Sequence, residues 1–341
     1  MSEAETKPIP FDMAVLRRYL SGRLDGFDGD VEVSEFTGGQ SNPSFLMRTA
    51  AGAYVLRKQP EGELLPRAHA VDREYRVMKG LGQTNVPVPR MFHLCEDREI
   101  VGTPFFVMEY VEGRVFRVPT LPDCTPADRA AIFDSMNEIL ANLHKVDPDA
   151  VGLGDFGRGG NYFSRQIDRW SKQYRASETE EHEDMEALIA WLPDRVPQDD
   201  TTTLVHGDFR LENLIFHPTE PRAVATLDWE LSTFGHPLGD LSHNCMLYHL
   251  PMDTFGGFVG HDLAALGIPS EEAYVEAYCK RVGLEGIEDW NFCIAYALFR
   301  MAAILQGVYA RALGGNAAAP DAMEKGPLVA VCARQGRALI D

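Results

Sequence analysis

The sequence predicts an α+β protein with two lobes: a small β-rich N-terminal lobe with one key helix, and a larger, mainly helical C-terminal lobe. The chain has 341 residues, more than a single hydrophobic core usually accommodates. Strand-like segments dominate from 31 to 58 and again from 90 to 111, whereas apolar residues recur at helical spacing from 125 onward. We therefore expect lobes of residues 1–111 and 112–341.

The N-terminal lobe is expected to open with a polar leader and a packing helix, together residues 1–29. Within 11–24, apolar residues recur at helical spacing. The pattern then changes to alternation, which is typical of strands. Glycines at 38–39 and at 52 divide it into a β-meander. The predicted strands cover residues 31–36, 45–47 and 54–58.

One helix and two further strands complete the predicted lobe. The segment 67–81 has apolar residues at helical spacing among charged ones, and Gly80 and Gly82 are stop signals. The Val-Pro-Val-Pro run at 86–89 forces an extended connection, because proline holds the backbone out of a helix. The last two strands are expected near 90–96 and 104–111.

Helical spacing prevails in the C-terminal lobe. Pro126 marks a helix start. A glycine-rich loop at 151–160 and an acidic run at 178–184 separate the helices that follow, and short apolar strands interrupt them between 204 and 227. One helix is predicted to start after 125 and a last one to end near 339. Between them, helices are predicted at 162–174, 185–192, 273–282 and 292–309.

Composition disfavours several functional classes. The six cysteines are scattered without a C-x-x-C pair, so neither a zinc knuckle nor a disulfide framework is indicated. A net charge of −19 disfavours nucleic acid and anionic lipid, which are polyanions. There is no run of about 18 apolar residues and no signal-peptide pattern in the polar N-terminus. We expect a cytoplasmic protein with neither nucleic-acid nor membrane partners, and the oligomeric state stays open.

Three side chains with oxygen atoms that can bind a metal ion or accept a hydrogen bond stand at the ends of short apolar runs. From these positions side chains can leave a packed strand and converge. The three residues are Asp208, Asn213 and Asp228. Phosphoryl transfer from a nucleotide needs metal ligands, a carboxylate for the acceptor hydroxyl and a cation for the phosphates. His206-Gly207-Asp208, with Asn213 five residues later, has the spacing of the protein-kinase catalytic loop. This spacing indicates a magnesium-nucleotide site.

The segment 205–213 and the run Asp-Trp-Glu-Leu-Ser-Thr-Phe-Gly-His-Pro-Leu-Gly-Asp-Leu at 228–241 resemble a known family. They are similar to the aminoglycoside phosphotransferase and choline kinase superfamily, particularly to kinase-like domains fused to some acyl-CoA dehydrogenases. The resemblance covers about residues 30–310 and implies a protein-kinase-like fold that binds ATP and Mg²⁺. The roles it implies are catalytic base for Asp208, loop brace for His206, and metal ligand for Asn213 and Asp228.

The upstream turn and strand are then expected to cover the nucleotide. The family places its phosphate loop at the glycine turn, here Thr37, Gly38, Gly39, Gln40 and Ser41, although the turn is not a G-x-G-x-x-G. On the next strand, alternation puts Arg57 on the face of Val55, so Arg57 would reach the phosphates and Lys58 would face solvent. A shift of one residue would exchange these two roles.

Three other residues complete the expected nucleotide and catalytic sites. Glu74, on the helix 67–81, is the expected ion-pair partner of Arg57, the residue expected to bind the phosphates. Backbone groups of Glu109 and Val111 would bind adenine, because this strand resembles the kinase hinge. Arg210 either contacts the transferred phosphate or forms a surface salt bridge.

The function expected from these patterns is ATP-dependent phosphorylation of a hydroxyl group on a small molecule. The resemblance permits an aminoglycoside, an amino alcohol such as choline, a sugar or a hydroxyacyl-CoA as acceptor. A nucleotide-binding pseudokinase or regulatory module is the alternative, and the presence of Asp208, Asn213 and Asp228 argues against it. Five histidines between 206 and 249 could suggest a metal centre, but they show no recognised ligand spacing.

Overall fold

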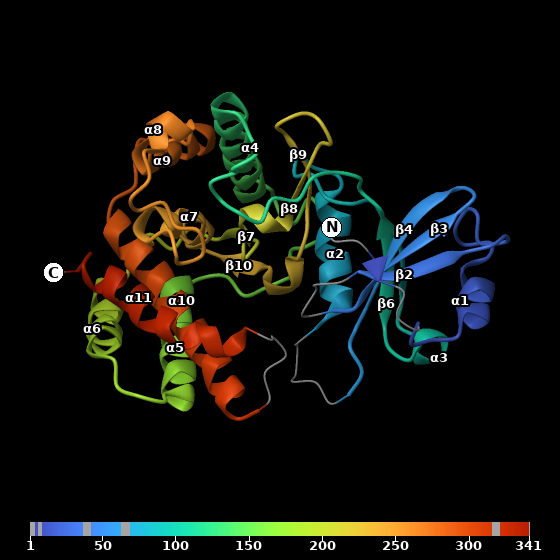
Figure 1. The fold of residues 1–341 in the computed structure, drawn as a ribbon, viewed down its shortest axis with the longest axis horizontal. Helices are drawn as coiled ribbons and strands as arrows, with labels where there is room; N and C mark the ends of the chain where they lie inside the picture. The colour runs from blue at the N-terminus through green and yellow to red at the C-terminus, as the bar shows by residue number, and fades with distance from the viewer. Residues whose placement is uncertain (1–3, 6–8, 37–41, 63–68, 316–320, 341) are drawn as a thin grey trace. The chain divides into compact units, whose positions relative to one another are not determined.

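The computed structural model divides into two compact units (Figure 1). The residues that it describes are 4–5, 9–36, 42–62, 69–315 and 321–340. The first unit contains residues up to 115, 149–154 and 213–232. The second unit contains residues 116–148, 155–212 and 233 onward.

An antiparallel sheet of six strands forms the frame of the first unit, in the order β1-β2-β3-β4-β6-β5. In its register, Arg57 lies opposite Ser44 on one side and Phe106 on the other. The predicted meander and the two later strands are therefore confirmed, with small differences at their ends. The strands are β1 (Ala4–Glu5), β2 (Glu32–Phe36), β3 (Ser44–Thr49), β4 (Gly52–Lys58), β5 (Met91–Cys95) and β6 (Phe105–Glu109).

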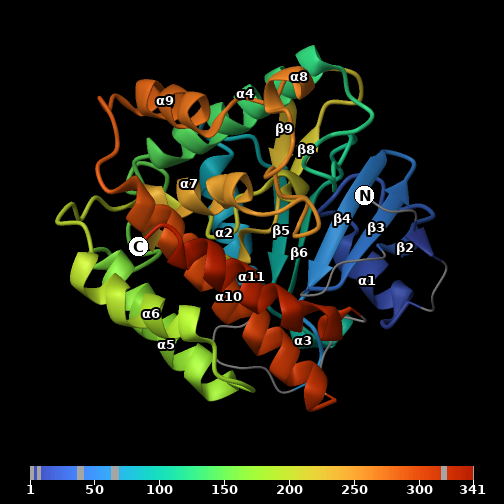
Figure 2. The ribbon, with the colours of Figure 1, turned by 60° about the vertical axis from the view of Figure 1, so that its left-hand side comes forward.

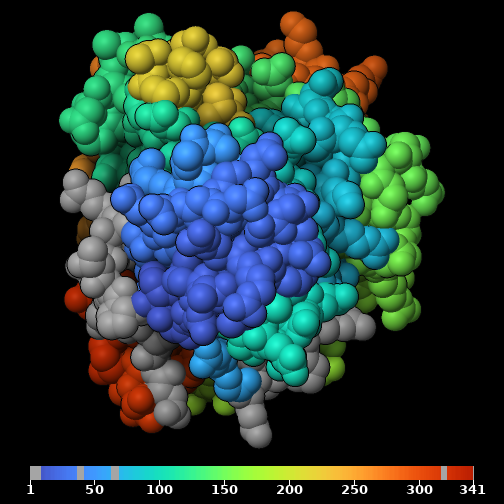
Figure 3. Space-filling model, turned by 90° about the vertical axis from the view of Figure 1, so that its right-hand side faces the viewer, coloured from blue at the N-terminus to red at the C-terminus, as the bar shows by residue number. Residues whose placement is uncertain are grey.

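One face of the sheet is covered by α1 (Met13–Leu20) and a short helix, α3 (Arg98–Val101). The Asp12 carboxylate caps α1 by accepting hydrogen bonds from the backbone N–H groups of Ala14 and Val15. In Figure 3 the dark blue atoms of α1 and β2 occupy the middle of this unit's visible surface. The core beneath them contains Leu16, Leu20, Phe27, Phe45, Met47, Tyr54, Leu56, Cys95, Val101, Phe105 and Val107.

The opposite face of the sheet packs against α2 (Val71–Leu81). The Tyr75 ring lies 6.2 Å from the Phe106 ring, centroid to centroid. This helix begins at Val71, later than the predicted start at 67; residues 67 and 68 lie outside the described part of the chain. Its buried residues include Glu74, so the helix directs a carboxylate at the sheet face that also contains Arg57.

A β-hairpin from the middle of the sequence also belongs to the first unit. Its strands are β8 (Leu214–Phe216) and β9 (Ala223–Thr226), and the short helix η3 (Trp229–Leu231) follows. Arg114 and Phe216 exchange two backbone hydrogen bonds of 2.8 Å, which tie the hairpin to the segment after β6. This pairing places residues just before and after the hairpin in the same unit as Arg57.

The second unit is mainly helical around α10 (Trp290–Leu313), beside which α11 runs in Figure 2. By length and composition α10 could cross a membrane, but 72% of its most apolar window is buried inside the structure. Its composition is therefore that of a core helix. The other helices here are α4 (Pro126–His144), α5 (Tyr162–Ser177), α6 (Glu183–Trp191), α7 (Pro237–Cys245), α8 (Leu263–Leu266), α9 (Glu271–Val282) and α11 (Gly326–Arg337).

The predicted start of α4 is confirmed in detail. Thr125 and Asp128 form a capping box, in which each side chain accepts from the other's backbone N–H, and Pro126 occupies the first turn. A two-stranded sheet of β7 (Thr203–Val205) and β10 (Thr233–Gly235) supports the loops around α7. The short 3-10 helices η1 (Leu192–Arg195), η2 (Leu211–Asn213), η4 (Met246–His249) and η5 (Ala322–Lys325) connect the longer elements.

Candidate active site

Asp208 lies in the tight loop that follows β7 in the second unit. Gly207, the residue before it, has φ +85°, a left-handed conformation that a side chain would strain. The Arg300 guanidinium donates a 2.6 Å hydrogen bond to the Gly207 carbonyl from the core of α10. The loop therefore has both the conformational freedom of glycine and a fixed anchor.

Asp240, in the first turn of α7, fixes the same loop. Its carboxylate accepts hydrogen bonds from the backbone N–H groups of His206 and Gly207, at 2.6 and 2.8 Å. Burial raises the pKa of Asp240, but its hydrogen bond and charge interaction with His144, together with the His206 imidazole and backbone N–H, hold the pKa below its ordinary value. The buried His206 accepts from the Asp208 backbone N–H at 3.2 Å. These contacts fix the backbone from which the Asp208 side chain projects.

The Asp208 carboxylate is held between two nitrogen groups. Its Oδ1 lies 2.9 Å from Nε2 of His243, and its Oδ2 lies 3.4 Å from Nε of Arg210. Burial raises the pKa of Asp208, but the His243 hydrogen bond and the Arg210 charge outweigh burial and hold the pKa well below its ordinary value. Asp208 is therefore ionised throughout the physiological range.

His243 is a site residue that the sequence does not single out, because there it is only one of five histidines without recognised metal-ligand spacing. It lies three residues after Asp240 on α7, so the two side chains leave the same face of the helix. Burial lowers the pKa of His243, and nearby Arg300 and Arg210 add to this effect against the hydrogen bond with Asp208. At neutral pH the imidazole is therefore uncharged and donates through Nε2.

Arg210 forms ion pairs with two carboxylates. Besides Asp208, it contacts Glu212, with 2.9 Å between Nη2 and Oε2. Its side chain is 46% exposed. The structure thus places Arg210 beside Asp208, the predicted catalytic base, and in contact with Glu212 of the same loop.

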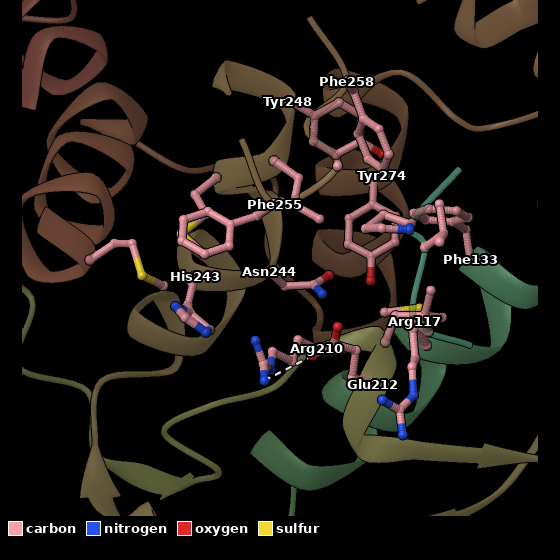
Figure 4. A pocket seen from close by; sticks show the side chains of 18 residues that line it. Arg117, Phe133, Arg210, Glu212, His243, Asn244, Tyr248, Phe255, Phe258 and Tyr274 are labelled. Carbon is pink, nitrogen blue, oxygen red and sulfur yellow. Dashed lines mark ion pairs between the residues drawn. The ribbon is translucent and has the colours of Figure 1, made fainter. Parts of the chain in front are cut away.

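A cavity of about 230 Å³ lies next to the Asp208 loop, within the second unit (Figure 4). His243 and Arg210 are shared between the cavity wall and the contacts of Asp208. Most other lining residues are apolar or aromatic. They are Val118, Pro119, Phe133, Met136, Leu211, Met246, Leu247, Tyr248, Phe255, Gly256, Phe258, Tyr274 and Met301, together with Arg117, Glu212 and Asn244.

A second charged cluster, in the first unit, joins β4, α2 and Asp228, which lies in the segment between β9 and η3. The Arg57 Nε atom lies 2.8 Å from Oε2 of Glu74, and its Nη2 lies 3.1 Å from Oδ1 of Asp228. Glu74 is 2% exposed, whereas Asp228 is 36% exposed. Burial raises the pKa of Glu74, and the charge of Arg57 only partly opposes that rise because Asp228 and Glu230 are also near.

Lys58 is placed differently from the prediction that it faces solvent. Its side chain is 2% exposed and donates hydrogen bonds to the Val101 carbonyl at 2.8 Å and to Glu61 at 3.1 Å. The alternation along β4 is as predicted, with Arg57 on the opposite face from Lys58. The prediction is wrong for Lys58 because α1 and α3 cover the face that it leaves open to solvent.

The two predicted metal ligands, Asn213 and Asp228, flank the hairpin of the first unit. The Leu227 N–H donates to the Asn213 carbonyl at 2.8 Å, so the residue before β8 lies opposite the end of β9. Asp228 has φ +65°, uncommon for a residue with a side chain. Carboxylate and amide oxygens are the ligands that Mg²⁺ accepts, with phosphates and water completing its shell. The donor set of Asn213 and Asp228 therefore fits a divalent cation in chemical type.

Two of the remaining predicted nucleotide residues, Glu109 and Val111, lie at and just after the end of β6. Glu109 ends β6, where its backbone N–H donates to the Arg90 carbonyl at 2.9 Å, and Val111 follows two residues later. The glycine turn, Thr37, Gly38, Gly39, Gln40 and Ser41, lies outside the described residues.

Within the described part of the chain, no group of three or more His, Cys, Asp or Glu side chains is placed to hold a metal ion.

Comparison with known proteins gives a family match over most of the chain. A model of the phosphotransferase enzyme family matches residues 32–278. Acyl-CoA dehydrogenase family member 10 of Mus musculus is 47% identical over 330 residues, which are 95% of this chain and 31% of that protein. The chain therefore spans less than half the length of this relative.

Two solved structures support the fold class. A provisionally assigned aminoglycoside phosphotransferase from Ralstonia eutropha is 46% identical, with a TM-score of 0.89 and coverage of 96% of this chain and 98% of that one. A thermostable variant of the aminoglycoside phosphotransferase APH(4)-Ia is 14% identical, with a TM-score of 0.62 and coverage of 95% and 98%. The predicted α+β, protein-kinase-like fold is thus confirmed.

Proposed function

Because the chain belongs to the phosphotransferase enzyme family, we propose that it transfers the γ-phosphoryl group of ATP to a hydroxyl group of a small molecule. The observation that carries this proposal is the setting of Asp208. Its carboxylate is ionised, fixed by His243 and Arg210, and one side chain away from a cavity that can hold an acceptor. In phosphoryl transfer, positioning and electrostatics contribute most of the rate.

Asp208 would accept a hydrogen bond from the attacking hydroxyl and orient it. Because its pKa is held well below the ordinary value, Asp208 is a weak base in the ground state. Its main contribution would therefore be orientation, with proton transfer as the phosphoryl group is acquired. His243 and Arg210 keep the carboxylate in one position while this occurs.

The first unit would bind the nucleotide. Arg57 would contact phosphate oxygens, supported by Glu74, and Asn213 and Asp228 would hold Mg²⁺, which neutralises phosphate charge when bound. Backbone groups of Glu109 and Val111 and the glycine turn would hold the rest of ATP. In support, the related APH(4)-Ia variant was crystallised with AMP-PNP and hygromycin B.

The lining of the cavity bears on the acceptor class. Its charged side chains are two arginines and Glu212, and Glu212 is already paired with Arg210. A polycationic aminoglycoside or a choline-like amino alcohol would meet little surplus negative charge there, and a sugar would meet few polar groups. Of the acceptors that the sequence permits, a hydroxyacyl thioester fits the apolar wall best. The relative named as an acyl-CoA dehydrogenase is consistent with this choice.

ADP release should be measured across a panel of hydroxylated metabolites, with wild type and Asp208→Asn. We expect at least one alcohol to stimulate ADP release and the variant to lose about a hundredfold or more of that activity. Asp168→Asn is the matched control, because Asp168 is 62% exposed and its ion pair is with Lys172, an exposed residue of the same helix. Nucleotide binding without any Asp208-dependent turnover would instead favour the pseudokinase alternative.

A further inference from the structure

The hydroxyl group of Tyr274 is a buried polar group that the phosphoryl-transfer chemistry leaves unused. Tyr274 lies in the first turn of α9 and is 3% exposed. Within the described part of the chain, its hydroxyl oxygen is buried and has no hydrogen-bond partner. Burying an unpaired hydroxyl is unfavourable, so such a group needs an explanation.

The same hydroxyl points into the cavity beside the Asp208 loop. Tyr274 is one of the residues that line this cavity, and Figure 4 shows its oxygen directed into the space on the side of Asn244. Around it the wall is mainly aromatic and aliphatic, including Phe133 and Phe258. The hydroxyl is therefore a polar group set within a mostly apolar part of the wall.

The tyrosine ring is held firmly in this orientation. Its edge packs against the Phe133 ring at 6.3 Å between centroids and 84° between planes. The Tyr274 carbonyl accepts a 2.8 Å hydrogen bond from the buried side chain of Asn137 on α4. Burial also raises the pKa of Tyr274 well above its ordinary value, so the phenol keeps its proton and can donate it in a hydrogen bond.

We propose that the Tyr274 hydroxyl donates a hydrogen bond to an oxygen of the acceptor molecule and thereby determines which alcohols are phosphorylated. The acceptor class that follows is an alcohol with an apolar body and a second oxygen, of the carbonyl, ester or carboxylate kind. This inference rests on the proposed function, since it assigns the cavity to the acceptor. A site built to hydrogen-bond a substrate oxygen discriminates strongly against analogues that lack it.

The test uses a matched pair of alcohols, the methyl ester of hydroxyhexanoic acid and hexanol, with wild type and Tyr274→Phe. This substitution removes the hydroxyl and keeps the ring. Wild type should prefer the ester. The Tyr274→Phe variant should have a kcat/KM for the ester about tenfold lower than that of wild type, whereas its kcat/KM for hexanol and its KM for ATP should be unchanged. Equal discrimination by the two proteins would overturn the proposal.

Tyr248→Phe is the control variant. Tyr248 lines the same cavity, but its hydroxyl already donates to the Pro269 carbonyl at 3.0 Å. Loss of that bond should lower thermal stability without changing the preference for the ester. If Tyr248→Phe changed the preference as much as Tyr274→Phe, a general disturbance of the wall would explain both results and the assignment to Tyr274 would fall.

Calorimetric binding of the same two compounds separates this proposal from the proposed function. If neither compound is phosphorylated but wild type binds the ester about tenfold more tightly than Tyr274→Phe does, Tyr274 recognises the oxygen and the phosphotransferase proposal is the one in difficulty. If turnover occurs and the hydroxyl makes no difference to either binding or kcat/KM, the phosphotransferase proposal stands and the Tyr274 proposal fails.

Discussion

The Nε2 atom of His243 lies 2.9 Å from Oδ1 of Asp208, and the His243 side chain is 3% exposed. A neutral imidazole in this position has one proton to donate, and the geometry directs it at the carboxylate. The contact therefore fixes one oxygen of Asp208 and leaves the other beside Arg210. The pair acts as an oriented carboxylate whose direction depends on a histidine outside the kinase-like motif.

His243→Ala should lower kcat about ten- to hundredfold and leave the KM for ATP unchanged, because it removes one hydrogen bond to a charged group. His243→Gln keeps an N–H donor at a similar reach and should restore most of the activity. Steady-state kinetics with ATP and the best acceptor would measure both effects. Equal losses in the Ala and Gln variants would show that packing, rather than the hydrogen bond, is what His243 contributes.

Stability should fall as pH is lowered from 7.5 toward 5. Burial, with Arg300 and Arg210, lowers the pKa of His243, so the unfolded state binds its proton more readily than the folded state. A lowered folded pKa contributes stability that is present above the unfolded pKa of about 6.5 and lost as pH falls through it. The slope for one such group is at most about 1.4 kcal/mol per pH unit.

Urea unfolding across this pH range measures that slope. His243→Gln, which cannot titrate, should show a smaller decrease in unfolding free energy than wild type. Asp208, whose pKa is also lowered, should contribute a further loss only below about pH 4. A steeper decrease in the variant than in wild type would contradict the assigned direction for His243.

Local patterns determined how much could be predicted. The start of α4 was readable because Pro126 is typical of the first turn of a helix, and the structure adds the cap that Thr125 and Asp128 form there. The four-residue helix α3 was not found, since one turn shows no periodicity. The pairing of Arg57 with Glu74 was predicted, because strand alternation and the order of elements both point to it.

Residues whose role depends on tertiary packing could not be assigned in the same way. Alternation placed Lys58 on the correct face of β4, but nothing local shows that α1 and α3 cover that face. His243 contacts Asp208 only because α7 packs against the loop, and Tyr274 has an unpaired hydroxyl only because a cavity adjoins it. Both facts come from elements that are far apart in the sequence.

Removing the Arg57 charge should destabilise the first unit. Arg57→Met leaves the buried Glu74 without its partner, and breaking a buried pair typically costs about 3–5 kcal/mol. The double variant Arg57→Met with Glu74→Gln should be more stable than Arg57→Met alone, because the buried charge is gone. Urea unfolding of wild type, Arg57→Met, Glu74→Gln and the double variant measures the coupling free energy between the two side chains. A double variant less stable than Arg57→Met would contradict the pairing.

The adjacent cations Arg57 and Lys58 should differ in their effect on nucleotide binding. Arg57 shares its sheet face with the cluster of Glu74 and Asp228, whereas Lys58 is directed to the Val101 carbonyl on the opposite face. Arg57→Lys keeps a positive charge but loses the planar fork, so the KM for ATP should rise about tenfold. Lys58→Met keeps an apolar stem of similar length and should leave that KM unchanged while altering thermal stability. The reverse order of effects would assign the phosphates to Lys58 and place Arg57 in a purely structural role.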